Sequence, residues 1–199
     1  MRLVKLLLLI FMTALWFCQG TAQASVAQEQ LKSGIDTILA VLQDNGLKGE
    51  ANTGKRRQVL RQAVNERFDF QKMSQLSLGR HWKSLSKEQK SEFSQLFSRF
   101  LESTYIAKIE AYTNEKVVYV KERVKKKKAQ INTKIITDTV EIPIDYRMYM
   151  KGSSQWMVYD MVIEGVSLVA NYRSQFGQIL DKDSFDVLVE KLESKIKED

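Results

Sequence analysis

The stretch QWMVYDMVIEGVSLVANYRSQF, which runs from Gln155 to Phe176, decides the fold of this chain. From Trp156 to Ile163 apolar or aromatic side chains stand at odd and even positions alike, which predicts a strand with two apolar faces. Such a strand is either covered on both sides or lines a cavity. Gly165 ends the extended pattern, and Ser167 is suited to cap a following helix. The stretch contains no evident nucleophile, base or metal ligand, so it indicates a part that holds something apolar rather than converts it.

The chain begins with the features of a secretory signal peptide. Arg2 and Lys5 precede an apolar run at 6–17, and Ala22-Gln23-Ala24 is a small-x-small cleavage site. The run is shorter than the roughly 20 residues that a membrane-spanning helix needs. We therefore expect cleavage after Ala24, export, and one domain over residues 25–199. The single cysteine, Cys18, precedes the cleavage site without the small residues of a lipidation motif, so a lipoprotein is the less favoured alternative.

The charge of the chain is modestly basic, with a formal net value of +7. Arg2 and Lys5 account for two of these charges, which leaves +5 after cleavage. This excess suits an acidic partner or an anionic membrane surface, but it is also common in exported domains. The run Lys125–Lys128 has two readings: a solvated hairpin turn that blunts a sheet edge, or a docking surface for an acidic partner. Nucleic acid is not expected as a partner, because the chain is exported and lacks an aromatic-rich RNA-binding motif.

The part of the chain before the sheet reads as four helices. We expect them at Val26–Leu42, at Lys55–Arg67, from the Asp69 cap to Gly79, and from the Ser86–Gln89 capping box to about Tyr112. The long fourth helix carries a wide apolar stripe, formed by Phe93, Leu96, Phe97, Phe100, Leu101, Tyr105, Ile106 and Ile109. This stripe is either an ordinary core face or a cavity wall that faces the sheet.

From Val117 onward the apolar period changes to two residues, which predicts a four-stranded antiparallel meander. The strands are expected at Val117–Val124, Ala129–Ile136 and Thr139–Lys151, with the fourth at Trp156. One face of the third strand is formed by Ile142, Ile144, Tyr146, Met148 and Met150. Pro143 lies on the other face, and its missing N–H requires an unpaired side or a bulge. Asp183 is expected to cap a closing helix.

Together these elements predict an α+β fold, in which a bent four-stranded meander is covered on its concave face by helices and encloses an apolar pocket. Enzyme signals are weak. His81 is the only histidine, and Gly165–Val169 lacks the second glycine of a nucleophile elbow. Carboxylates such as Asp160 and Glu164 are more often surface groups or caps than catalytic pairs, and the same holds for Asp145. We expect no catalytic residue, no metal and no cofactor, and a lipid hydrolase is only a remote alternative.

Several motifs resemble those of the MlaC family, the toluene-tolerance type of periplasmic lipid-binding proteins. They are Phe70-x-x-Met73, Leu78-Gly79-x-x-Trp82, Leu85-Ser86-x-Glu88-Gln89, Phe93 with Phe97, and Leu101-x-x-x-Tyr105. The most specific block is Trp156-x-x-Tyr159-Asp160-x-x-x-Glu164-Gly165-x-Ser167, followed by Asn171-Tyr172-Arg173. The resemblance covers residues 68–192, and the lysine-rich turn at Lys125–Lys128 departs from the family pattern.

The resemblance implies a periplasmic carrier of phospholipids, whose bound phospholipid is cargo rather than cofactor, and we expect the chain to be monomeric. Its partners would be an outer-membrane lipoprotein complex and an inner-membrane ABC transporter with a lipid-receiving subunit. Its role would be to maintain the lipid asymmetry of the outer membrane. The alternatives are a carrier of another apolar lipid, such as a hopanoid, and an exported structural or adaptor protein with a filled core.

Elementary physics agrees with a carrier. Exposing acyl chains to water costs about 0.8 kcal/mol per CH₂, so two chains of ordinary length cost roughly 20 kcal/mol or more. A carrier therefore needs an apolar cavity, and methionine adapts such a cavity to chains of different shape. The residues expected to surround the lipid are Phe97, Leu101, Tyr105, Ile144, Tyr146, Met148, Trp156, Val158, Val166 and Tyr172.

Overall fold

A computed structural model of the chain describes residues 24–112 and 115–198, so the predicted signal peptide lies outside it except for Ala24. Six α-helices are described: α2 (Val26–Gln43), α3 (Thr53–Asn65), α4 (Phe70–Leu78), α5 (Lys87–Glu110), α6 (Leu168–Leu180) and α7 (Phe185–Glu198). Short 3₁₀ turns lie at η2 (Asn45–Leu47), η3 (Glu50–Asn52) and η4 (Gly79–Ser84). The strands are β1 (Lys116–Lys125), β2 (Lys128–Ile136), β3 (Glu141–Lys151), β4 (Gln155–Ile163) and β5 (Val166–Ser167).

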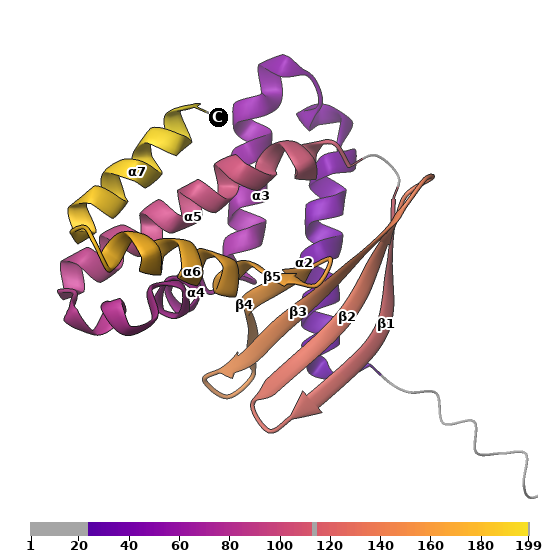
Figure 1. Cartoon of the computed structure of the whole chain (residues 1–199). Coiled ribbons are helices and arrows are strands. Elements are labelled where there is room, and N and C mark those ends of the chain that lie inside the picture. The colour runs from indigo at the N-terminus through magenta and orange to yellow at the C-terminus, as the bar shows by residue number, and fades with distance from the viewer. Residues whose placement is uncertain (1–23, 113–114, 199) are drawn as a thin grey trace, which may run out of the picture.

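The predicted antiparallel meander is confirmed, with one strand added. The sheet order is β1-β2-β3-β4-β5, and each pair is antiparallel (Figure 1). The additional strand β5 returns along β4 through the two-residue turn Glu164-Gly165, where φ is 50° and 84°. Two positive φ values in succession match the twist of a tight hairpin. Ser167 therefore ends this hairpin and also caps α6, because its Oγ accepts a hydrogen bond from the Ala170 N–H at 3.0 Å.

Several predicted boundaries are wrong by one or two residues; the second helix, for example, covers Thr53–Asn65 rather than Lys55–Arg67. The β1–β2 turn is Lys126-Lys127, because Lys126 adopts a φ of 54° and this lets Lys125 pair with Lys128. The third strand begins at Glu141 rather than Thr139. The closing helix is capped by Ser184 and not by Asp183. The Ser184 Oγ accepts from the Val187 N–H at 3.4 Å, whereas the Asp183 carboxylate pairs with Lys191 at 3.5 Å.

Pro143 lies where its missing donor costs little, as predicted. The pairing of β3 with β4 ends at Ile144–Ile163, and the carbonyl of Pro143 accepts from the Glu164 N–H at 3.0 Å. The N–H and C=O of one residue in an antiparallel strand face the same neighbour. The position without a donor therefore faces the Glu164-Gly165 turn, beyond the end of the β4 ladder.

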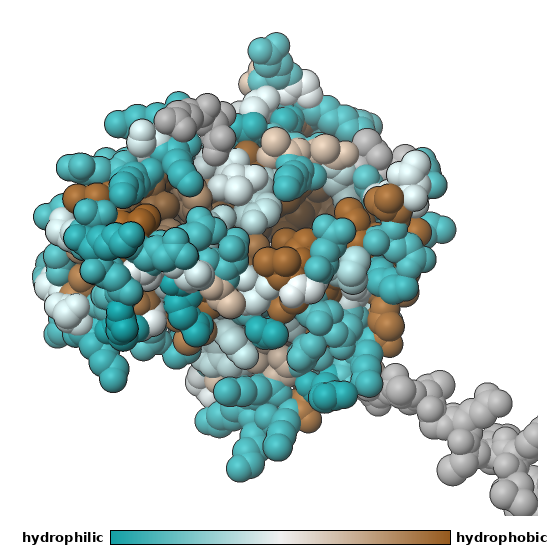
Figure 2. All heavy atoms as spheres, viewed as in Figure 1, coloured by the Kyte–Doolittle hydropathy of each residue, from teal (hydrophilic) through white to brown (hydrophobic). Residues whose placement is uncertain are grey.

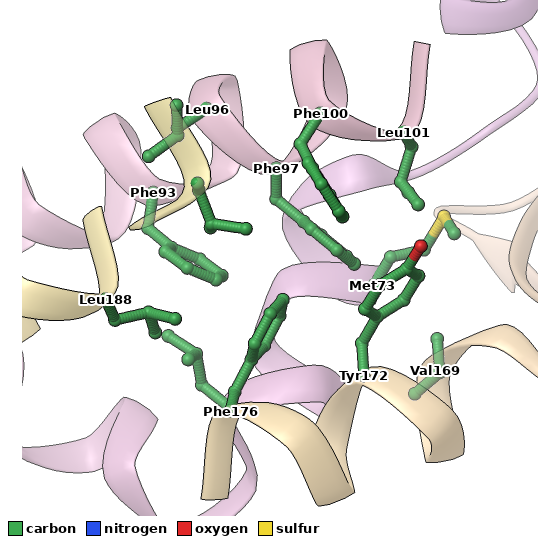
Figure 3. Packing of buried hydrophobic residues seen from close by; sticks show 12 residues of the cluster. Met73, Phe93, Leu96, Phe97, Phe100, Leu101, Val169, Tyr172, Phe176 and Leu188 are labelled. Atoms are coloured by element: carbon green, nitrogen blue, oxygen red, sulfur yellow. The ribbon is translucent and has the colours of Figure 1, made fainter. Parts of the chain in front are cut away.

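The long helix α5 packs against other helices and not against the sheet, which corrects the reading of its stripe as a wall facing the sheet. Its aromatic side chains meet those of α6 edge to face: the ring centroids of Phe97 and Tyr172 lie 5.3 Å apart, and those of Phe93 and Phe176 lie 5.7 Å apart. Figure 3 shows these rings pointing toward one another from the two helices, with Leu188 of α7 beside them. From Phe93 to Tyr105 the stripe is thus part of a helical core formed by α4, α5, α6 and α7, which lies beside the β4 end of the sheet. Its last residues, Ile106 and Ile109, pack instead against α2, η2 and α3.

Candidate functional site

One face of the sheet, called here the inner face, carries the apolar residues of the third strand. The strand register aligns them in rows: Ile131, Tyr146 and Met161 form one row, and Ala129, Met148 and Val158 form another. Helix α2 packs on this face through Ala27, Leu31 and Ile35. The side chains of β4 that point to the other face of the sheet are buried as well, at Met157, Asp160 and Val162. The prediction of a strand covered on both sides is therefore confirmed.

Polar contacts hold the start of α2 at one end of the inner face. The Gln30 side chain accepts from the Trp156 N–H at 2.8 Å and donates to the Ser154 carbonyl at 2.9 Å. The Ser25 N–H donates to the Glu122 carboxylate at 3.1 Å. At this end Met148 and Val158 are fully buried. These anchors close one end of the inner face.

The other end of the inner face is only partly covered. Its side chains are half-buried and form what we call the open apolar patch: Tyr119, Ile135, Ile142, Met161 and Ile163, with Ile35 of α2 beside them. Figure 2 shows a hollow with hydrophobic walls in this region, between the C-terminal part of α5, α2 and the β4–β5 hairpin. Apolar surface that is neither filled by side chains nor fully exposed is the usual lining of a site for an apolar ligand.

Two tyrosines of the inner face are neutral at physiological pH: Tyr119, which belongs to the open apolar patch, and Tyr146, which pairs with Met161 of the patch. Burial raises the pKa of Tyr146 to about 12. Burial also raises the pKa of Tyr119, and the neighbouring Tyr146 and Asp36 raise it further. The Tyr119 hydroxyl is buried without a hydrogen-bond partner in the described part of the chain. The surroundings therefore favour uncharged ligand groups over ionised ones.

The ten residues predicted to surround a lipid do not form one group. Five lie together on the inner face: Ile144, Tyr146, Met148, Trp156 and Val158. Four belong to the helical core: Phe97, Leu101, Tyr105 and Tyr172. Val166 stands apart on β5, where 56% of its surface is exposed. Phe68 contacts both clusters, and its backbone bridges to Val158 on the edge of β4.

Sequence reasoning missed most of the open apolar patch. Ile142 was placed on the correct face by the alternation of the third strand, but Tyr119, Ile135, Met161 and Ile163 were not selected. The signal was clear only at Ile135, which stands two residues from the buried Thr133 on its own strand. Tyr119 lies next to a bulge of β1, and a bulge at Tyr159 separates Met161 and Ile163 from the buried residues of β4. What the spacing could not indicate is which end of the face α2 leaves uncovered.

Two depressions of about 500 and 520 Å³ lie elsewhere on the surface. The first follows the outer side of α2, and the second lies between α3, α4 and α5. Neither is lined by any of the ten predicted residues, and polar or charged side chains make up most of each lining. We therefore regard the open apolar patch as the candidate site.

The β4–β5 hairpin joins this site to α6 through a buried carboxylate. Asp160 is only 3% exposed and accepts from Arg147 Nη1 at 2.9 Å, from Ser167 Oγ at 2.7 Å and from the Val169 N–H at 3.1 Å. Asp160 is therefore a helix cap, one of the two structural roles expected for it. The same contacts fix the direction in which α6 leaves the sheet.

We predict that Gly165→Val lowers the free energy of unfolding by about 1–2 kcal/mol, because a β-branched residue is strained at a φ of 84°. No atom lies within 4 Å of a Cβ added there, so backbone strain and not a clash is the cause. Ser167→Ala should cost about 1 kcal/mol through the lost cap. Urea unfolding measures both variants, with Gly54→Val, in a helix and free of neighbouring atoms, as the control for a new valine. A Gly165→Val protein as stable as the parent would contradict the strain.

The described residues, 24–112 and 115–198, contain no helix that is both long and apolar enough to cross a membrane. In the same part of the chain, no three histidine, cysteine or carboxylate side chains gather in a way that could hold a metal ion. His81 accepts from Arg80 at 3.4 Å and lies 3.1 Å from the Asp181 carboxylate, near the ends of η4 and α6. The side chains that line the open apolar patch are apolar apart from the Tyr119 hydroxyl, so they provide mainly apolar contact.

The fold and the patch define the structural class: an α+β protein in which a twisted antiparallel meander presents a partly covered apolar face beside a helical core. The family model of the MlaC protein matches residues 32–194, and the chain belongs to this family. It is 27% identical, over 192 residues, to the intermembrane phospholipid transport system binding protein MlaC of Haemophilus influenzae. That match covers 94% of this chain and 90% of the relative.

A solved structure has the same fold as this chain. The phospholipid-binding protein from Ralstonia solanacearum, determined in complex with a phospholipid, superposes with a TM-score of 0.79 at 27% identity. The match covers 86% of this chain and 97% of that protein. The family expected from the sequence motifs is thereby confirmed, and so is the fold class, with five strands in place of four.

Proposed function

We propose that this chain is a phospholipid carrier that holds acyl chains on the open apolar patch. The observation that carries the proposal is the inner face itself, which α2 seals at one end and leaves partly covered at the other. The relatives support it, since one is named as a phospholipid transport binding protein and another was solved with a phospholipid bound. A carrier function without catalysis agrees with the family of lipid-binding transport proteins.

The energetics favour loading from a membrane. Acyl chains leave a bilayer for an apolar protein surface at nearly equal free energy, because lipid tails are as apolar as leucine. The same chains would cost about 0.8 kcal/mol per CH₂ in water. A site with uncharged walls and one open end therefore lets lipid enter and leave while it keeps the tails dry.

The residues around the tails are assigned as follows. Ile142, Ile163 and Met161 of the open apolar patch contact the chains, and Ile144 and Tyr146 continue the contact inward. Met148, Trp156 and Val158 form the closed floor beneath α2. Phe97, Leu101, Tyr105 and Tyr172 support the site from the helical core, and Val166 lies at its rim.

We further propose that the carrier works in the periplasm of a Gram-negative cell, after removal of residues 1–24. There it passes phospholipids between an outer-membrane lipoprotein complex and an inner-membrane ABC transporter, and so maintains outer-membrane lipid asymmetry. The predicted signal peptide and the relative's description as an intermembrane transport protein support this placement.

Native mass spectrometry of the mature chain, purified from a Gram-negative host, tests the proposal. We expect a mass increase that corresponds to phospholipid at a fixed ratio to protein. A clean ligand-free mass after gentle purification would favour the adaptor alternative, in which the inner face is filled core. Another apolar lipid in place of phospholipid would identify the hopanoid-type alternative.

We predict that Ile163→Trp weakens phospholipid binding about 100-fold. The larger side chain displaces roughly three to four CH₂ groups of a tail, each worth about 0.8 kcal/mol. Ile163 is half-buried, so the indole can extend into the hollow without unfolding the sheet. Val140→Trp is the matched control, because Val140 is 54% exposed in the β2–β3 turn. A displacement titration with a fluorescent phospholipid measures both variants, and equal affinities would show that Ile163 does not contact the lipid.

A further inference from the structure

The net positive charge of the mature chain is concentrated in one hairpin. Residues 121–128 read KERVKKKK and carry six basic side chains and one acidic one, a net charge of +5. The whole chain carries +7, of which Arg2 and Lys5 supply two. The other residues of 25–199 therefore carry equal numbers of acidic and basic side chains. We call residues 121–128 the basic hairpin.

The basic hairpin is free of local neutralisation within the described residues. None of the ion pairs found there involves Lys121, Arg123 or any residue of Lys125–Lys128. All six side chains are exposed. The single acid, Glu122, points to the inner face and accepts from Ser25, so its carboxylate is engaged with α2.

The same strand also exposes apolar side chains. Val118, Val120 and Val124 of β1 are 44%, 55% and 45% exposed. β1 is the outer strand of the sheet, and Figure 1 shows its hairpin with β2 projecting at the end of the sheet remote from α5 and α7. Basic and small apolar side chains are thus exposed along the same edge, which suits a partner with a polar surface and an apolar layer beneath it.

We propose that the basic hairpin docks the protein on anionic phospholipid membranes. A protein partner fits the composition less well, because protein interfaces are poor in lysine and rich in arginine and aromatic residues. Here five of the six cations are lysines, and residues 120–130 contain no aromatic side chain. An anionic lipid surface instead attracts clustered lysines nearly additively, at distances within about one Debye length.

This docking is separate from the loading of lipid. The turn at Lys125–Lys128 and the Val117–Ile135 pair lie at opposite ends of the β1–β2 ladder. At about 3.3 Å per residue, the hairpin tip is roughly 20 Å from the open apolar patch. The bilayer therefore meets the basic hairpin and leaves the patch free, which keeps the protein near the membrane without pressing its site into the lipid.

Sedimentation of the mature chain with vesicles tests the docking. We expect binding to phosphatidylglycerol vesicles that salt weakens, and little binding to phosphatidylcholine vesicles. The variant K121Q/K125Q/K127Q/K128Q should bind phosphatidylglycerol at least about 100-fold more weakly. Lys126 is kept in this variant because the turn depends on its φ of 54°. Circular dichroism confirms that the sheet persists.

The matched control is K48Q/K83Q/K182Q/K195Q, which removes the same charge from four exposed lysines elsewhere. It should retain most of the vesicle binding, and an equal loss in both variants would overturn the role of the hairpin in favour of net charge. A parent protein that does not bind phosphatidylglycerol vesicles at physiological salt also overturns the proposal. A protein that carries lipid in native mass spectrometry but does not bind vesicles refutes the docking proposal alone. A protein that binds vesicles but carries no lipid refutes the carrier proposal alone.

Discussion

Phe97→Ala should lower the free energy of unfolding by about 4 kcal/mol, the loss typical of a large aromatic removed from a filled core. Phe97 has no exposed surface, and its ring meets those of Phe93, Phe100, Tyr172 and Phe176. Truncation would leave a cavity between α5 and α6 that the surrounding rings cannot close without moving both helices. Urea denaturation followed by circular dichroism measures this loss.

The same variant separates two roles for this side chain. If Phe97 only supports the site from the helical core, the protein that remains folded should bind phospholipid as the parent does. Phe185→Ala is the control. Phe185 is half-buried and its ring centroid lies 6.0 Å from that of Phe93, so the same change should cost less stability. Lost lipid binding with little lost stability would show instead that Phe97 lines the pocket.

Most of the fold follows from local patterns in the sequence. The capping box Ser86–Gln89 marks the start of α5, and both of its hydrogen bonds are present. The alternation of the third strand gives the inner face because a pleated strand places every second side chain on one side. These features depend on neighbours a few residues apart, and such neighbours are visible in the sequence.

Other parts of the fold depend on contacts between distant residues. The stripe of α5 shows that one side of the helix is buried, but the partner that covers it is set by how α6 leaves β4 through Asp160 and Ser167. Gly165 was recognised as the end of the strand. The return strand β5 was not expected, because glutamate is not a residue type that predicts a positive φ, and Glu164 nevertheless adopts a φ of 50°.

The candidate site was only half predictable for the same reason. Period-two spacing selected the inner face, and five of the ten chosen residues lie on it. The open end depends on where α2 stops covering the sheet, and this is fixed by Gln30 bonding to Trp156, 126 residues away in the chain. Spacing along one strand carries no information about such an anchor.

A second large effect is expected at Asp69, which joins α4 to the sheet. It is 7% exposed, and its Oδ1 accepts from the Lys72 N–H at 2.9 Å. Its Oδ2 accepts from the Tyr149 hydroxyl and from Lys151 Nζ, the latter at 3.1 Å. Burial alone would raise the pKa of this carboxyl, but the hydrogen bonds from Tyr149, the Lys72 N–H and Lys151 outweigh burial and lower it.

Asp69→Ala should therefore lower the free energy of unfolding by about 3 kcal/mol at neutral pH, through the lost cap and the lost charge-assisted bonds. Because the pKa is depressed in the folded state, this stabilisation is complete above the ordinary aspartate pKa near 4 and is lost as the pH falls through the lower, folded value. The gap in stability between parent and variant should thus narrow in acid, and urea unfolding at pH 7 and near pH 3 measures it. Asp145→Ala, which removes a half-buried carboxylate bonded to Gln130, is the control and should cost less at pH 7. A gap that stays constant or widens in acid would show that the ionised Asp69 carboxylate is not what holds α4 to β3.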